Sequence, residues 1–141
     1  MDGYQNLAHS RYDCKYHVVF VPKFRKKALF GQIRQHLKGV FHELARQKGC
    51  KIISGHIAKD HVHMCIEIPP KYAVAEAVGY LKGKSAIAVA RQLGGKQRNF
   101  GGENLWARGY AVSTVGFELD SLNKYIAEQE KTDSDRDEGK F

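Results

Sequence analysis

Apolar residues recur along the chain with two different spacings, and the spacing predicts the type of each element. Short runs rich in β-branched and aromatic residues predict three strands, at residues 15–21, 51–58 and 61–68. Longer runs that repeat an apolar residue every three or four positions predict two helices, at residues 28–48 and 73–93.

The pattern continues after a basic, glycine-rich loop at residues 94–102, with a strand at 107–115 and a last helix at 118–130. The order is therefore β-α-β-β-α-β followed by a helix. This order predicts a ferredoxin-like, RRM-like α+β fold: an antiparallel sheet with both crossover helices on one face. The other face stays available for a ligand or partner. Because unrelated RNA-binding and metabolic domains share this fold, function must be argued from a site.

Length and charge narrow the class of protein. The 141 residues suffice for one domain, expected over residues 1–130, followed by a polar, disordered tail at 131–141. The chain carries +8; its tail has three basic and four acidic residues, so the first 130 residues carry +9. Such an excess favours a polyanionic partner. Neither a membrane-length apolar run nor a signal-peptide pattern is present, so we expect a cytoplasmic protein without membrane contact.

The strand at 61–68 contains the sequence His61-Val62-His63. Alternate side chains of a strand share a face, so both imidazoles lie on the face opposite the apolar set that begins with Val62. Two imidazoles so spaced can converge on one metal ion, although two surface histidines facing solvent remain an alternative. Glu67 shares their face, where it either orients an imidazole or is solvated.

The last predicted helix places Tyr125 and Gln129 one turn apart on the same face, because they are four residues apart. Spacing alone gives this tyrosine a packing role more often than a chemical one. Glu128 and Glu130 are rival metal ligands on the same helix.

Several long motifs of the chain resemble the HUH single-tyrosine transposases of the insertion-sequence 200/605 type. The resemblance covers about residues 10 to 130, in order, and is carried by residues 16–23, 60–63 (Asp-His-Val-His), 68–72, 80–85 (Tyr-Leu-Lys-Gly-Lys-Ser), 105–110 (Leu-Trp-Ala-Arg-Gly-Tyr) and 113–116. The family has the fold described above with an added helix. Its histidine pair matches His61 and His63, its nucleophile matches Tyr125, and its third metal ligand matches Gln129.

The resemblance implies a DNA transposase that cleaves and rejoins single-stranded DNA through a 5′-phosphotyrosine intermediate. Phosphoryl transfer needs charge neutralisation, and two imidazoles with one amide oxygen suit Mg²⁺ or Mn²⁺. The family acts as a homodimer with joined sheets, binds hairpins at the ends of its elements, and can complete the metal site in trans. Gly116 would then be the hinge of the tyrosine helix.

Basic residues near the sheet face and loops are candidates for contacts with the DNA backbone. Each is by default a solvated charge, but together they form a credible track for phosphates. The candidates are Lys23, Arg25, Lys26, Lys27, Lys82, Lys84, Lys96 and Arg98.

Two other functions remain open at the level of sequence. One is a non-catalytic RNA- or single-stranded-DNA-binding module, although such a sheet usually displays aromatic residues where this strand has histidines. The other is a domesticated relative that processes chromosomal repeat hairpins by the same chemistry.

Overall fold

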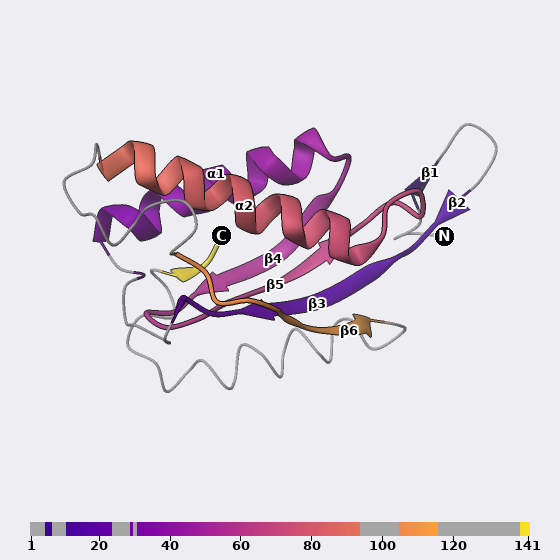
Figure 1. Ribbon diagram of the computed structural model, residues 1–141. Coiled ribbons are helices and arrows are strands. Elements are labelled where there is room, and N and C mark those ends of the chain that lie inside the picture. Colours follow the sequence, from indigo (N-terminus) through magenta and orange to yellow (C-terminus); the bar gives the residue numbers. More distant parts are fainter. Residues whose placement is uncertain (1–4, 7–10, 24–28, 30, 94–104, 116–138) are drawn as a thin grey trace.

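The computed structural model describes residues 5–6, 11–23, 29, 31–93, 105–115 and 139–141 (Figure 1). Two short strands come first, β1 (Gln5–Asn6) and β2 (Arg11–Tyr12), which pair with each other and were not predicted. The main elements follow in the order β3 (Lys15–Phe20), α1 (Gly31–Gln47), β4 (Lys51–Ile57), β5 (Val62–Glu67), α2 (Val74–Leu93) and β6 (Ala111–Val115).

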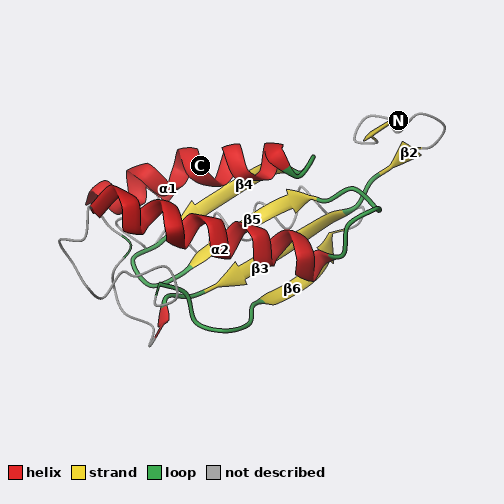
Figure 2. Ribbon diagram, turned by 45° about the horizontal axis from the view of Figure 1, so that its top comes forward, coloured by secondary structure: helices red, strands yellow, loops and turns green. Residues whose placement is uncertain are grey.

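The four longer strands form one antiparallel sheet in the order β4-β5-β3-β6. Figure 2 shows α1 and α2 side by side over one face of this sheet. The predicted α+β, ferredoxin-like fold is therefore confirmed. The helix predicted at residues 118–130 lies outside the described residues. No helix in the described part of the chain is long and apolar enough to span a membrane.

Alternation along the central strands divides the sheet into two chemically different faces. Val18 and Phe20 of β3 and Met64 of β5 point toward the helices and are buried. Leu37 and Phe41 of α1 pack into the same cluster. The residues between these core positions, which include the histidines, must point to the opposite face.

The ends of α1 follow from specific hydrogen bonds. At its C-terminus, Gly49 has φ of 67° and donates to the carbonyl of Arg46, while the amide of Cys50 donates to Ala45. These two bonds are those of a Schellman motif, in which a glycine at positive φ follows the last turn of the helix. At the other end, the amide of Leu29 donates to Lys59, so this residue is not part of the helix predicted from residue 28.

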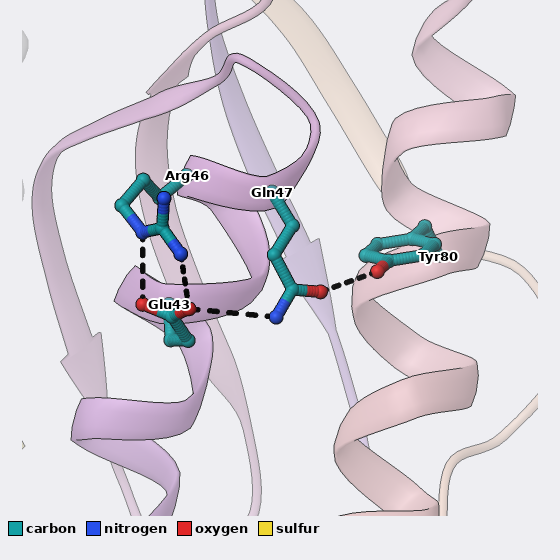
Figure 3. Close-up of polar contacts among 4 residues, drawn as sticks. All are labelled: Glu43, Arg46, Gln47 and Tyr80. Atoms are coloured by element: carbon teal, nitrogen blue, oxygen red, sulfur yellow. Dashed lines mark hydrogen bonds and ion pairs between the residues drawn. The ribbon is translucent and has the colours of Figure 1, made fainter.

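Polar side chains tie the end of α1 to α2 (Figure 3). The Tyr80 hydroxyl donates to Oε1 of Gln47 at 2.5 Å. The amide of Gln47 contacts Glu43 at 3.5 Å, and Arg46 donates two hydrogen bonds to the same carboxylate. This cluster lies in the helix layer, between α1 and α2.

Two family motifs meet where α2 contacts the segment before β6. Lys82 donates to the carbonyls of Ala107 at 2.7 Å and Gly109 at 2.8 Å, and Trp106 donates from its ring nitrogen to Ser85 at 3.0 Å. Gly109 adopts φ of 82°. Because this segment is held by side chains and turns at a glycine, β6 begins at Ala111 rather than at the predicted residue 107.

The end of the chain differs from the expected disordered tail. Lys140 bridges to His56 in antiparallel fashion, and the amide of Phe141 donates to the carbonyl of Gly55 at 3.0 Å. The last residue has an apolar ring that reaches the core, which explains why it contacts the sheet. Residues 131–138 of the expected tail lie outside the described residues.

Candidate functional site

His61 and His63 lie at the start of β5 on the face of the sheet opposite α1 and α2. His61 directly precedes the strand and His63 is its second residue. Their rings are stacked, with centroids 5.2 Å apart and planes inclined by 10°. The structure thus brings the two predicted metal ligands together, with one ring partly exposed and the other 8% exposed.

Asp60, the residue before the pair, orients the first imidazole. Its Oδ1 lies 2.9 Å from Nδ1 of His61. In the tautomer that donates a proton from Nδ1 to the carboxylate, Nε2 keeps its lone pair for a metal ion. Asp60 is part of the Asp-His-Val-His motif, but its orienting role was not predicted from the sequence.

His63 is neutral in its surroundings. Burial, followed by the neighbouring histidines His61, His56 and His17, lowers its pKa from 6.5 to about 3. A neutral imidazole is the form that binds a metal ion. The alternative of two histidines facing solvent is therefore wrong for His63.

Two further histidines, which the sequence analysis missed, complete a cluster around His63. The ring of His56 on β4 lies 5.5 Å away, and the ring of His17 on β3 lies 5.7 Å away. His56 is the direct cross-strand partner of His63. Alternation places each of them on the correct face of its strand, but only the register shows that the rings meet.

One buried ring nitrogen of the cluster has no hydrogen-bond partner among the described residues. Nε2 of His17 is buried without a hydrogen-bond partner in the described part of the chain. Burial also lowers the pKa of this imidazole. Buried nitrogens are usually satisfied, so this atom indicates a polar ligand or further residues at this face.

The prediction of a solvated Glu67 is wrong. Its side chain is buried rather than solvated, and its Oε2 lies 3.8 Å from Nζ of Lys15. Lys15 in turn pairs with Asp13. The carboxylate therefore takes part in an ion-pair group with Lys15 and Asp13.

The donor set of the histidine pair fits a divalent metal ion. Both rings offer nitrogen ligands, burial keeps that of His63 neutral, and Asp60 contacts that of His61. Over the described residues, no group of three His, Cys, Asp or Glu side chains is arranged to hold a metal ion. The pair therefore requires a ligand from elsewhere. Gln129, the predicted third ligand, lies outside the described residues, as do Tyr125 and Gly116.

The described candidates for DNA contacts differ in their surroundings. The Nζ of Lys82 is engaged by two backbone carbonyls and lies 6.0 Å from the Phe20 ring, and burial lowers its pKa. Lys84 is exposed on α2, and Lys23 is partly exposed after β3. The remaining candidates lie outside the described residues: Arg25, Lys26, Lys27, Lys96 and Arg98.

Comparison with known proteins connects this site to a chemistry. The family model described as "Transposase IS200 like" matches residues 10–129. The transposase of insertion sequence element IS200 from Salmonella typhimurium is 38% identical over 133 residues, which cover 94% of this chain and 88% of that protein.

Two solved structures share the fold. A Deinococcus radiodurans R1 protein assigned as a transposase has a TM-score of 0.71 and 28% identity, with 89% of this chain and 97% of that chain covered. A REP-associated tyrosine transposase bound to a REP hairpin has a TM-score of 0.63 and 15% identity, with 92% of this chain and 75% of that chain covered.

The fold and these matches define a DNA-processing enzyme of the transposase class. Within that class, the chain belongs to the IS200-like family, the single-tyrosine HUH transposases of the insertion-sequence 200/605 type. This membership argues against the non-catalytic RNA-binding module.

Proposed function

We propose that this transposase cleaves and rejoins single-stranded DNA by transesterification, with Tyr125 as the nucleophile. The observation that carries the proposal is the stacked pair His61 and His63, with Asp60 on the first ring and burial around the second. Such a pair is a preformed half of a metal site, and Gln129 is its proposed third ligand. A bound Mg²⁺ or Mn²⁺ ion would supply positive charge to the non-bridging oxygens of the scissile phosphate.

The role of Tyr125 is covalent. Its phenolic oxygen forms a bond to phosphorus while the bond to the 3′ oxygen breaks and that oxygen takes up a proton. The products are a 5′-phosphotyrosine and a free 3′-OH. Because a phenol with a pKa of about 10 leaves more readily than an alcohol, the 3′-OH of a strand can reverse the step and restore a phosphodiester.

The DNA substrate is proposed to be a hairpin in a single strand. The REP-associated transposase with the same fold is bound to a hairpin, which supports this class of substrate. The net charge of +9 over the first 130 residues suits a phosphate backbone. Among the described residues, Lys84 is exposed and Lys23 is partly exposed, and both are candidates for contacts with the DNA backbone.

A homodimer is proposed to form through the edge of β6. Among the described strands, β6 is the last of the sheet, and its residues 111–114 are exposed, with Val112 45% exposed. The opposite edge, β4, is paired with Lys140. An exposed edge strand is a template for pairing with a second chain, so β6 is the edge at which two sheets would join. Hinge motion at Gly116 and completion of the site in trans belong to the same proposal.

A cleavage assay with labelled hairpin DNA tests the chemistry. In the presence of Mn²⁺, a 3′-labelled oligonucleotide should become attached to the protein in a form stable to SDS, whereas a 5′-labelled one should yield a free fragment ending in 3′-OH. Tyr125→Phe should still bind the hairpin but form no adduct. The matched control Tyr110→Phe, at an exposed tyrosine, should form adduct at the wild-type rate.

Several outcomes would refute the assignment. Adduct formation by Tyr125→Phe would mean that another residue is the nucleophile. Full activity of His63→Ala, or activity in excess EDTA, would show that cleavage does not depend on a metal ion at the histidine pair. Equal cleavage of a duplex of the same sequence would contradict the single-stranded substrate.

A further inference from the structure

The segment Gly139–Phe141 lies against the edge of β4. Its backbone bridges to His56 through Lys140 and donates to the carbonyl of Gly55 through Phe141. The Phe141 ring crosses the edge to the helix layer, where its centroid lies 5.5 Å from that of Phe41 and 5.8 Å from that of His42. The segment therefore contacts the core with its ring and the strand with its backbone.

Two glycines make this close approach possible. A Cβ on Gly55 would lie 2.5 Å from Cε1 of Phe141, so the ring occupies the space that a side chain on β4 would need. A Cβ on Gly139 would lie 2.7 Å from Cε1 of His56 and closer still to the carbonyl oxygen of Ile57. Real Cβ atoms do not come this close, so a side chain at residue 55 would displace the Phe141 ring, and one at residue 139 would clash with the backbone of β4.

The contact with Gly139 leads directly to the histidine cluster. His56 is 2% exposed, and the same imidazole that meets Gly139 lies 5.5 Å from the ring of His63. His56 thus has Gly139 against its ring and His63 as its cross-strand neighbour. A change in the position of the segment must alter the space that the His56 ring can occupy.

We propose that Gly139–Phe141 is a positioning element of the histidine site. The Phe141 ring, seated over Gly55, holds the segment on β4, and Gly139 fixes the His56 ring against His63. The effect on metal binding rests on the proposed function, which gives His63 its role as a ligand. The match to the family model ends at residue 129, so this element lies outside the region that the model describes.

Two variants test the proposal by opposite changes. Phe141→Ala removes the ring, and Gly55→Ala keeps the ring but places a methyl group where the ring packs on β4. Phe141→Leu, which retains an apolar side chain, should restore much of the function. Gly79→Ala is the matched control, because a Cβ there would meet no atom within 4 Å.

Three measurements separate docking from positioning. Hydrogen exchange of the β4 amides reports whether the segment is docked. The ring resonances of His56 and His63, recorded without metal, report whether the cluster has moved. Mn²⁺ affinity and adduct rate report the consequence, and both should fall about tenfold in Phe141→Ala and Gly55→Ala, as for other groups that orient metal ligands.

The expected result is faster β4 exchange, shifted histidine resonances and weaker Mn²⁺ binding in both variants but not in Gly79→Ala. Faster exchange with unchanged resonances and Mn²⁺ affinity would overturn the proposal, and so would unchanged exchange in both variants. If the wild-type protein neither binds Mn²⁺ nor forms an adduct, the proposed function fails by itself. The His63 resonance then decides: a shift supports the positioning role, and no shift overturns it.

Discussion

Replacing Lys82 by methionine should destabilise the protein without weakening its electrostatic attraction to DNA. The methionine keeps an apolar stem next to Phe20 but removes the ammonium group that donates to the carbonyls of Ala107 and Gly109. This segment connects Trp106 in the core to the first residue of β6. The variant therefore tests whether the lysine acts on the fold or on the substrate.

The magnitude follows from the two acceptors. A hydrogen bond from a charged donor contributes roughly 1.5–3 kcal/mol, and more is lost when the acceptor stays buried. The Ala107 carbonyl belongs to a half-buried residue, whereas Gly109 is exposed and its carbonyl regains water. Desolvation of the ammonium, which lowers its pKa, offsets part of the gain. We therefore expect a loss of about 2 kcal/mol in the free energy of unfolding.

Urea-induced unfolding of Lys82→Met and Lys84→Met provides the measurement and the matched control. Lys84 lies two residues further along α2 with an exposed side chain, so its replacement should change stability by less than about 0.5 kcal/mol. Hairpin affinity should be measured across a range of salt concentrations. A residue that neutralises one phosphate of a single strand lowers the salt slope by about 0.7 when removed, and Lys82→Met should leave the slope unchanged.

Equal stability of the two variants would refute the reasoning, because it would show that the hydrogen bonds of Lys82 contribute nothing net. A reduced salt slope in Lys82→Met would show that its ammonium binds phosphate, as the sequence analysis predicted, rather than the two carbonyls.

Two further predictions concern the histidine site and the sheet edge. Burial lowers the pKa of His63 from 6.5 to about 3, so between these pH values the imidazole is protonated in the unfolded chain but not in the folded one. The free energy of unfolding, measured in EDTA, should therefore fall by up to about 1.4 kcal/mol per pH unit as the pH drops from 6.5 toward 3. In His63→Gln, the free energy of unfolding should depend less on pH over this range. If it depends on pH as steeply as in the wild type, the lowered pKa of His63 is contradicted. Val112→Lys, on the exposed edge of β6, should shift a dimer toward the 15.9 kDa monomer in light scattering, and an unchanged dimer would place the interface elsewhere.

Most of the fold was predictable because its elements bury one face each. The strand and helix periods along β3, α1, β4, β5 and α2 come from core residues such as Phe20, Phe41 and Met64, and periodicity records burial directly. The strands β1 and β2 have two residues each and no apolar period. The start of β6 depends on bonds from Lys82, a residue about 25 positions earlier, which no local pattern contains.

The candidate site was predictable only in part, for a related reason. His61 and His63 share one strand, so alternation alone brings them to one face. His17 and His56 join them through cross-strand register, and the β4 register includes a shift between Ile52 and Ser54 that a sequence pattern does not reveal. The docking of Phe141 depends on a glycine some 86 positions away, and its surroundings in the sequence are polar and acidic.

The position of α1 and α2 on one face of the sheet has a practical consequence for experiments on single molecules. A dye or surface linker placed on the outer surface of α1 stands on the side of the sheet away from the histidines. Gln35 is an exposed position there, so Gln35→Cys offers an attachment point. The native thiols of Cys50 and Cys65 are buried, and burial raises the pKa of each to about 11, so only Cys14 needs replacement before labelling. In a molecule tethered in this way, the dye or surface lies on the opposite side of the sheet from the histidine cluster.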